Sequence, residues 1–86
     1  MEETREFRGI SKRLAVQYLE TLGGERADEA SDRIESDGWT AELSERTVNP
    51  VGSITLNQVR IHFEGDESTL GPVVERFAQK AMRAGG

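Results

Sequence analysis

The sequence predicts a single domain of the α+β class in two layers: a three-stranded antiparallel meander with two helices packed on one face. Apolar residues recur at helical spacing in one segment near each end of the chain, and they alternate with polar residues in the segments between. The predicted order is therefore helix, strand, strand, strand, helix (α-β-β-β-α), since both helices can cover the one apolar face of such a sheet. A chain of 86 residues has room for one domain, 1–86, of which residues 1–9 are expected to fray.

The first helix is predicted from Ser11 to Leu22. Ser11 is a suitable N-cap because its hydroxyl can accept a hydrogen bond from a first-turn N–H, and Gly23–Gly24 supplies the backbone freedom at which helices end. Lys12 and Arg13 stand in the first turn, where the positive end of the helix dipole favours acidic side chains. This mismatch makes Lys12 and Arg13 candidate binding residues.

The pair Asp37–Gly38 predicts a hairpin, because both central positions of a type I′ turn need a positive φ. The resulting register sets Ser36 opposite Trp39, Ile34 opposite Ala41 and Arg33 opposite Glu42. The last of these pairs can form a cross-strand ion pair. Trp39 then shares the apolar face, so we expect it in the core and not at an exposed binding site.

A third strand is predicted within residues 53–65, after a second turn at Pro50 to Gly52. Its apolar residues alternate with polar ones: Val59, Ile61 and Phe63 against Arg60, His62 and Glu64. Ile54 and Leu56 have the opposite parity, so a bulge or bend is expected near Asn57–Gln58 if both pairs point inward.

The second helix is predicted to begin at Ser68 or Thr69, with Pro72 in its first turn, and to run to Ala84. Acidic residues precede it and basic residues lie near its end, as the helix dipole favours.

The composition excludes several function classes. The net charge of −5 disfavours a nucleic-acid binder, because phosphate backbones would be repelled. The absence of cysteine excludes disulfides, cysteine-bound metals and thiol catalysis, and it indicates a reducing, cytoplasmic setting. No apolar run approaches the roughly 18 residues of a membrane span, so no membrane contact is expected. An acidic composition whose lysines are Lys12 and Lys80 resembles that of proteins from halophilic archaea.

His62 is the one histidine of the chain, and it is predicted on the solvent-facing side of its strand between Arg60 and Glu64. A histidine beside a glutamate can act as an acid–base pair, but no nucleophile or second metal ligand lies near it in the sequence. We therefore expect no catalytic residue, no metal and no cofactor. Arg60, His62 and Glu64 are interpreted as an interaction surface for a homodimer or a protein partner.

A basic cluster near the N-terminus could contact nucleic acid or an acidic partner; it comprises Arg5, Arg8, Lys12 and Arg13. Glutamates are interleaved with it, so a solvated terminus is the favoured interpretation.

The last two residues, Gly85 and Gly86, allow two interpretations. Ubiquitin-like modifiers and sulfur carriers end in a free Gly-Gly, because an activating enzyme takes a terminus without side chains into a narrow site. Such carriers have a β-grasp fold, which starts with a hairpin, whereas this chain is predicted to start and end with helices. A helix stop is therefore favoured over a carrier tail.

Three segments, "EFRGISKRLAVQYLETLGG", "DGWTAEL" and "VRIHFEGDESTLGPVVERFAQKAMRAGG", resemble a small archaeal and thermophile domain. It is the C-terminal domain of proteins related to MoaD, the small subunit of molybdopterin synthase. The resemblance covers nearly the whole chain, but its motifs are structural and it transfers no active residue. It implies a compact domain associated with molybdenum-cofactor and sulfur-carrier proteins.

We therefore expect a non-enzymatic accessory or interaction domain. The alternative is a modifier or sulfur carrier that acts through the Gly86 carboxylate. A weaker alternative is a nucleic-acid-associated protein that uses the N-terminal basic cluster.

Overall fold

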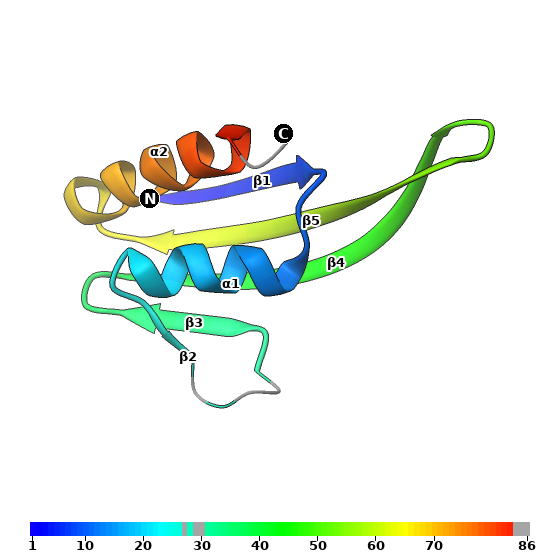
Figure 1. Ribbon diagram of the computed structural model, residues 1–86. Coiled ribbons are helices and arrows are strands. Elements are labelled where there is room, and N and C mark those ends of the chain that lie inside the picture. Colours follow the sequence, from blue (N-terminus) through cyan, green and yellow to red (C-terminus); the bar gives the residue numbers. More distant parts are fainter. Residues whose placement is uncertain (27, 29–30, 84–86) are drawn as a thin grey trace.

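The computed structural model describes residues 1–26, 28 and 31–83, in which helices and strands form two layers (Figure 1). The elements are β1 (Glu2–Arg8), α1 (Lys12–Thr21), β2 (Glu25–Arg26), β3 (Arg33–Ser36), β4 (Trp39–Val51), β5 (Ile54–Gly65) and α2 (Glu67–Arg83). The α+β class and the placement of both helices on one face agree with the prediction. The predicted order and the number of strands are wrong, because one strand precedes α1 and a short one follows it.

All five strands belong to one antiparallel sheet with the order β1-β5-β4-β3-β2. Strands β2 to β5 form a meander, and β1 pairs with the remaining edge of β5 over seven residues, from Glu2 opposite Glu64 to Arg8 opposite Gln58. The expectation that residues 1–9 fray is therefore wrong. Strand β1 satisfies the backbone N–H and C=O groups that the edge of β5 would otherwise expose.

Strand β1 changes the comparison with β-grasp carriers, because a helix was predicted as the first element. The chain starts with a strand and not with a helix. In the described residues α1 follows β1 directly, so the order of elements differs from the β-grasp order of a hairpin followed by a helix.

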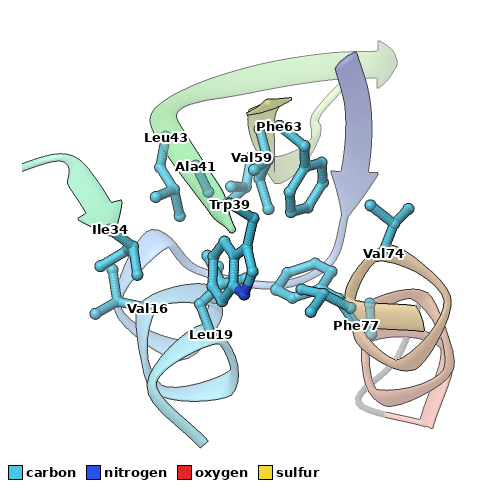
Figure 2. Packing of buried hydrophobic residues seen from close by; sticks show 14 of the residues in the cluster. Val16, Leu19, Ile34, Trp39, Ala41, Leu43, Val59, Phe63, Val74 and Phe77 are labelled. Carbon is cyan, nitrogen blue, oxygen red and sulfur yellow. The ribbon is translucent and has the colours of Figure 1, made fainter. Parts of the chain in front are cut away.

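The core lies between the sheet and the two helices (Figure 2). Helix α1 contributes Ala15, Val16 and Leu19, and α2 contributes Leu70, Val73, Val74, Phe77 and Ala81. The strands contribute Ile34, Trp39, Ala41, Leu43, Val59, Ile61 and Phe63. Trp39 is 4% exposed, which confirms its predicted place in the core.

Phe77 connects both helices to the sheet. Its ring packs edge-on against Phe7 of β1, Tyr18 of α1 and Phe63 of β5, at centroid distances of 4.9, 5.9 and 6.2 Å. Edge-on packing suits the charge distribution of aromatic rings. One side chain therefore holds four elements in a single core.

The hairpin at Asp37–Gly38 has the predicted register. Ser36 pairs with Trp39, Ile34 with Ala41 and Arg33 with Glu42. The expected ion pair joins Arg33 Nη1 to Glu42 Oε1 at 2.6 Å. Gly38 has a φ of 89°, but Asp37 does not have a positive φ, so the turn is not of the predicted type I′.

The far end of the β4–β5 hairpin extends beyond the rest of the sheet as an arm (Figure 1). Its turn lies at Gly52 and Ser53, so Pro50 belongs to β4 and the predicted turn at Pro50 to Gly52 is displaced. Pairing of the strands up to Val51 opposite Ile54 moves the turn toward the C-terminus.

No register shift occurs near Asn57–Gln58, where a bulge was expected. The β4–β5 register is continuous from Trp39 opposite Gly65 to Val48 opposite Leu56, and the irregularity falls between Val48 and Val51 of β4. Ile54 is 53% exposed, so no bulge is needed to turn it inward.

The ends of the helices follow the capping signals with one difference. Ser11 caps α1 as predicted, because its hydroxyl accepts a hydrogen bond from the N–H of Leu14 at 3.1 Å. Helix α2 begins at Glu67, earlier than predicted, so Pro72 lies inside the helix and not in its first turn. The helix extends to Arg83, and Gly85 and Gly86 lie outside the described residues.

Candidate functional site

One face of the sheet is covered by neither helix, and it carries three of the residues that the sequence singled out: Arg60, His62 and Glu64. We call it the open sheet face. The strand registers place on it Glu2, Thr4, Glu6 and Arg8 of β1, Gln58, Arg60, His62 and Glu64 of β5, Thr40, Glu42, Ser44 and Arg46 of β4, Arg33 and Glu35 of β3, and Glu25 of β2. Side chains of this face are polar because the opposite face supplies the core.

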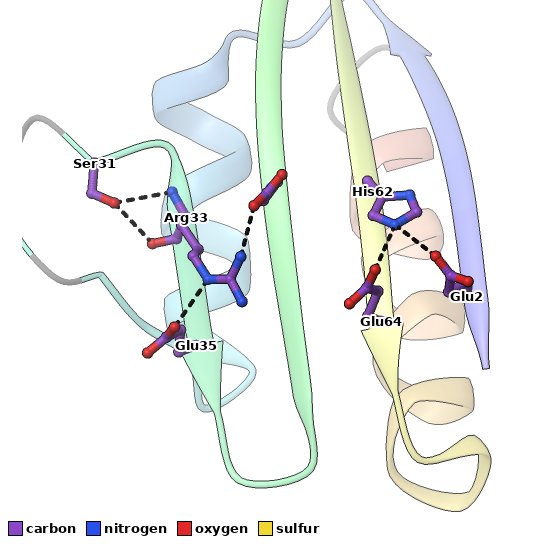
Figure 3. Close-up of polar contacts among 7 residues, drawn as sticks. Glu2, Ser31, Arg33, Glu35, His62 and Glu64 are labelled. Atoms are coloured by element: carbon purple, nitrogen blue, oxygen red, sulfur yellow. Dashed lines mark hydrogen bonds and ion pairs between the residues drawn. The ribbon is translucent and has the colours of Figure 1, made fainter.

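His62 lies between two carboxylates on this face (Figure 3). Its Nε2 is 3.1 Å from Glu64 Oε1 and 3.2 Å from Glu2 Oε1. Its Nδ1 is 2.8 Å from the hydroxyl oxygen of Thr4. Both ring nitrogens of His62 therefore have partners. The polar atoms of Glu2 from β1 and of His62 and Glu64 from β5 lie close together.

The neighbouring side chains lower the pKa of Glu64. Its pKa lies below the ordinary value, chiefly because His62 hydrogen-bonds to its carboxylate. The charge of His62, when the ring is protonated, and that of Arg33 lower this pKa as well. The ionised form of Glu64 is thus the favoured one.

A second ionic group lies beside the first. Arg33 Nε contacts Glu35 at 2.9 Å, and its Nη1 contacts Glu42, which pairs across the sheet with His62. The hydrogen bonds that Arg33 donates to Glu35 and Glu42 raise the pKa of Arg33. Arg33 therefore binds the carboxylates of Glu35 on β3 and Glu42 on β4, and not those of Glu2 and Glu64.

Arg60 occupies the middle of the open sheet face, between Glu6 on β1 and Ser44 on β4. Among the described residues, no carboxylate lies within ion-pair distance of its guanidinium group. Two adjacent surface hollows share Arg60 and Ser44: one reaches Thr4 and His62, and the other reaches Glu6 and Gln58. Arg60 is thus exposed and available for contacts with another molecule.

Gln58 anchors the other side of the second hollow. It is 2% exposed, and its amide is held by Glu6 Oε2 at 2.5 Å and by Arg8 Nε at 3.4 Å. A buried amide needs such partners, so this end of the face is fixed in place.

Lys12 contacts two acidic side chains of the same chain. Its backbone N–H donates to Glu45 Oε2 at 2.9 Å, and its Nζ contacts Asp32 Oδ1 at 2.6 Å. Glu45 of β4 supplies the negative charge that the first turn of α1 lacks, which explains the mismatch seen in the sequence. Arg13 is exposed on the next position of the helix.

The predicted basic cluster is divided between surfaces. Arg5 lies on the helix side of β1 and pairs with Glu3 at 3.3 Å, whereas Arg8 lies on the open sheet face. Lys12 contacts Asp32 instead. The structure therefore does not bring these residues to a single patch.

Glu2 and Thr4 were not predicted from the sequence as site residues. Thr4 and His62 are 58 positions apart, and they meet only because β1 pairs with β5. The available signal was weak, since Phe7 is the only apolar residue of β1. The expectation of no metal ligand near His62 considered sequence neighbours alone.

Within the described residues, neither helix has the length and hydropathy needed to cross a bilayer. Comparison with protein families gives a match that spans every element from β1 to α2: residues 3–86 fit the model of archaeal MoaD-like proteins. No protein with a curated description matches the chain. The resemblance noted in the sequence is confirmed by this match, and the chain belongs to the archaeal MoaD-like protein family.

Proposed function

We propose that this chain is a non-enzymatic accessory domain that binds a protein of a sulfur-carrier or molybdenum-cofactor system through the open sheet face. Membership of the archaeal MoaD-like family supports this class of partner. The observation that carries the proposal is the asymmetry of the sheet. Two helices cover one face (Figure 1), whereas polar residues from all five strands share the other.

The polar side chains of this surface are held by one another. Glu2 and Glu64 contact His62, Glu35 and Glu42 contact Arg33, and Glu6 contacts Gln58. Side chains that are already ordered lose less conformational freedom when a partner binds. The open sheet face is therefore suited to binding without rearrangement.

Arg60 is the residue that we expect to anchor the partner. It is exposed, it has no ion-pair partner among the described residues, and it lies between two hollows. Arginines at such central positions contribute strongly to many interfaces, because their planar guanidinium group forms several hydrogen bonds.

The test measures binding to the activating enzyme of the same organism's sulfur-carrier system by isothermal titration calorimetry. We expect Arg60→Glu to weaken binding at least about tenfold, or about 1.4 kcal/mol. Arg76→Glu is the matched control, because Arg76 is exposed on α2 away from the open sheet face. Equal effects of the two variants, or no binding by the natural chain, would contradict the proposal.

A sulfur carrier that acts through the Gly86 carboxylate is the second candidate, and family membership favours it. In such a carrier one carboxylate oxygen is replaced by sulfur after adenylation. Helix α2 extends to Arg83, which favours the accessory domain, since carriers present an extended tail.

Intact-mass measurement after incubation with the activating enzyme, ATP and a sulfur donor separates the two candidates. A mass gain equal to replacement of oxygen by sulfur, absent when Gly85 and Gly86 are deleted, would establish the carrier. An unchanged mass together with Arg60-dependent binding supports the accessory domain.

A further inference from the structure

The histidine and the two glutamates described above bring three metal-binding atoms together on the open sheet face. His62 Nε2 and one carboxylate oxygen each of Glu2 and Glu64 lie within 4.8 Å of one another. Figure 3 shows both carboxylates directed at the same edge of the imidazole ring. We propose that Glu2, His62 and Glu64 bind a divalent transition-metal ion, with Zn²⁺ as its simplest representative.

The separations of the donor atoms suit such an ion. Bonds of about 2.0–2.2 Å in a tetrahedral zinc site place neighbouring ligand atoms about 3.3–3.5 Å apart. Nε2 lies 3.1 and 3.2 Å from the two glutamate oxygens. Small side-chain movements therefore place an ion between the three atoms, and water fills the remaining position.

The backbone fixes these three side chains relative to one another. Glu2 pairs directly with Glu64, and Gly65 at the end of β5 donates its N–H to the carbonyl of Met1 at 3.0 Å. Glu2 is thus held by ladder bonds on both sides although it lies near the start of the chain. A site built on two paired strands loses little freedom when the ion binds.

Thr4 keeps the imidazole ring in place whether or not an ion is bound. Its hydroxyl lies 2.8 Å from Nδ1 and can either donate or accept, because a hydroxyl hydrogen rotates. Without an ion, Nε2–H donates to the carboxylates. With an ion, Nε2 gives up its proton and binds the metal through its lone pair, while Nδ1–H donates to Thr4. Metal-binding histidines regularly have an outer hydrogen-bond partner of this kind.

The neighbouring charges leave these ligands available. Within the described part of the chain, no arginine or lysine contacts Glu2 or Glu64, whereas Glu35 and Glu42 are bound by Arg33. Two carboxylates and one imidazole form the mixed oxygen and nitrogen set that zinc accepts, whereas a set of oxygen ligands alone would suit magnesium, calcium or manganese. Arg33 thereby distinguishes Glu2 and Glu64 from Glu35 and Glu42.

The test titrates ZnCl₂ into the untagged chain in a calorimeter, and it repeats the titration with CoCl₂ while recording the visible spectrum. We expect one ion per chain. His62→Ala and Glu64→Gln are expected to weaken binding at least about tenfold, and Thr4→Val about tenfold, with recovery in Thr4→Ser because the hydroxyl is restored. Glu75→Gln is the matched control. Glu75 is exposed on α2, and its substitution removes the same charge as Glu64→Gln does.

The visible cobalt spectrum reports ligand geometry, which a purely structural role of Thr4 would not alter. Circular dichroism verifies that each variant is folded. Absence of zinc binding by the natural chain would overturn the proposal. Binding that His62→Ala leaves unchanged, or that Glu75→Gln weakens as much as Glu64→Gln does, would place any bound ion elsewhere on the acidic surface and would also overturn it.

Discussion

Gly65 stands where β5 ends opposite the first residue of β4, and it has no space for a side chain. A Cβ at Gly65 would overlap the carbonyl oxygen of Gly38 and lie 2.7 Å from the Cα of Trp39. We expect Gly65→Ala to lower the free energy of unfolding by about 1–3 kcal/mol, because the two strands must separate to admit the methyl group. Urea denaturation followed by Trp39 fluorescence measures this change.

Gly71→Ala serves as the control for crowding. A Cβ at Gly71 would meet nothing within 4 Å outside its chain neighbours. Alanine favours the helix, whereas a side chain before Pro72 is disfavoured in helical conformation, so we expect a net change within about 1 kcal/mol. If both variants lose equal stability, close approach of the strands at Gly65 is not the cause.

The candidate site shows which residues a sequence can reveal. Arg60, His62 and Glu64 share a face because strand alternation is a local pattern. Glu2 and Thr4 join them through the pairing of β1 with β5, and no pattern within a short window reports contacts between such distant residues. The sequence therefore predicted the site residues of β5 but not those of β1.

The start of α1 depends on two side chains outside the helix, Ser11 and Glu45. Ser11→Ala removes the acceptor for the N–H of Leu14, and we expect a loss of about 1 kcal/mol in the free energy of unfolding. Ser68→Ala is the control, because Ser68 is exposed in the first turn of α2, and it should change stability by less than about 0.5 kcal/mol. Chemical denaturation of both variants provides the comparison. Equal losses would show that the cap does not stabilise α1.

Among the residues that the structure describes, no third strand pairs with the arm of β4 and β5 on the turn side of Asn57. The arm carries two exposed apolar side chains, Val51 at 67% and Ile54 at 53% exposure. We expect its amides to exchange with solvent by local opening, much faster than those of Ile61 and Phe63, because few buried contacts hold them. Native-state hydrogen exchange read by NMR tests this gradient. Uniform protection that depends on protein concentration would instead indicate that the arm packs against a second copy of the chain.

The elements that the sequence predicted are those with local pairing. The hairpin at Asp37–Gly38 has its turn and both strands within a few residues, so its register followed from turn chemistry. Strands β1 and β2 lie at the two edges of the sheet, where one has a single apolar residue and the other has two residues in total. Edge strands bury little apolar surface, and their sequences therefore carry little alternation.

At the scale of the whole molecule, the fold class was predictable because it depends on the total apolar pattern, which both helices and the strands β3 to β5 express. The open sheet face was also predictable as polar. Which residues lie side by side on this face depends on the order of the five strands. That order has β1 and β2 at its edges, and neither strand was predicted from the sequence.

The net charge of −5 sets how the stability of the whole domain depends on salt. Acidic residues repel one another more strongly in the compact state than in the unfolded chain, so screening favours folding. The ion pairs of the open sheet face oppose this effect, but each exposed pair contributes only about 0–1 kcal/mol. We expect the free energy of unfolding to rise as NaCl increases from about 0.1 to 1 M, over which the screening length falls from about 10 to about 3 Å.

The double variant Glu20→Gln/Glu75→Gln tests this explanation by changing the net charge from −5 to −3 (−5 + 2). Both residues are exposed on the helices and lie outside the ion pairs described above. Because less repulsion remains to be screened, the variant should be more stable at low salt and should gain less stability from added NaCl. Stability that falls with salt in the natural chain would show instead that ion pairs such as Arg33 with Glu42 outweigh the net repulsion.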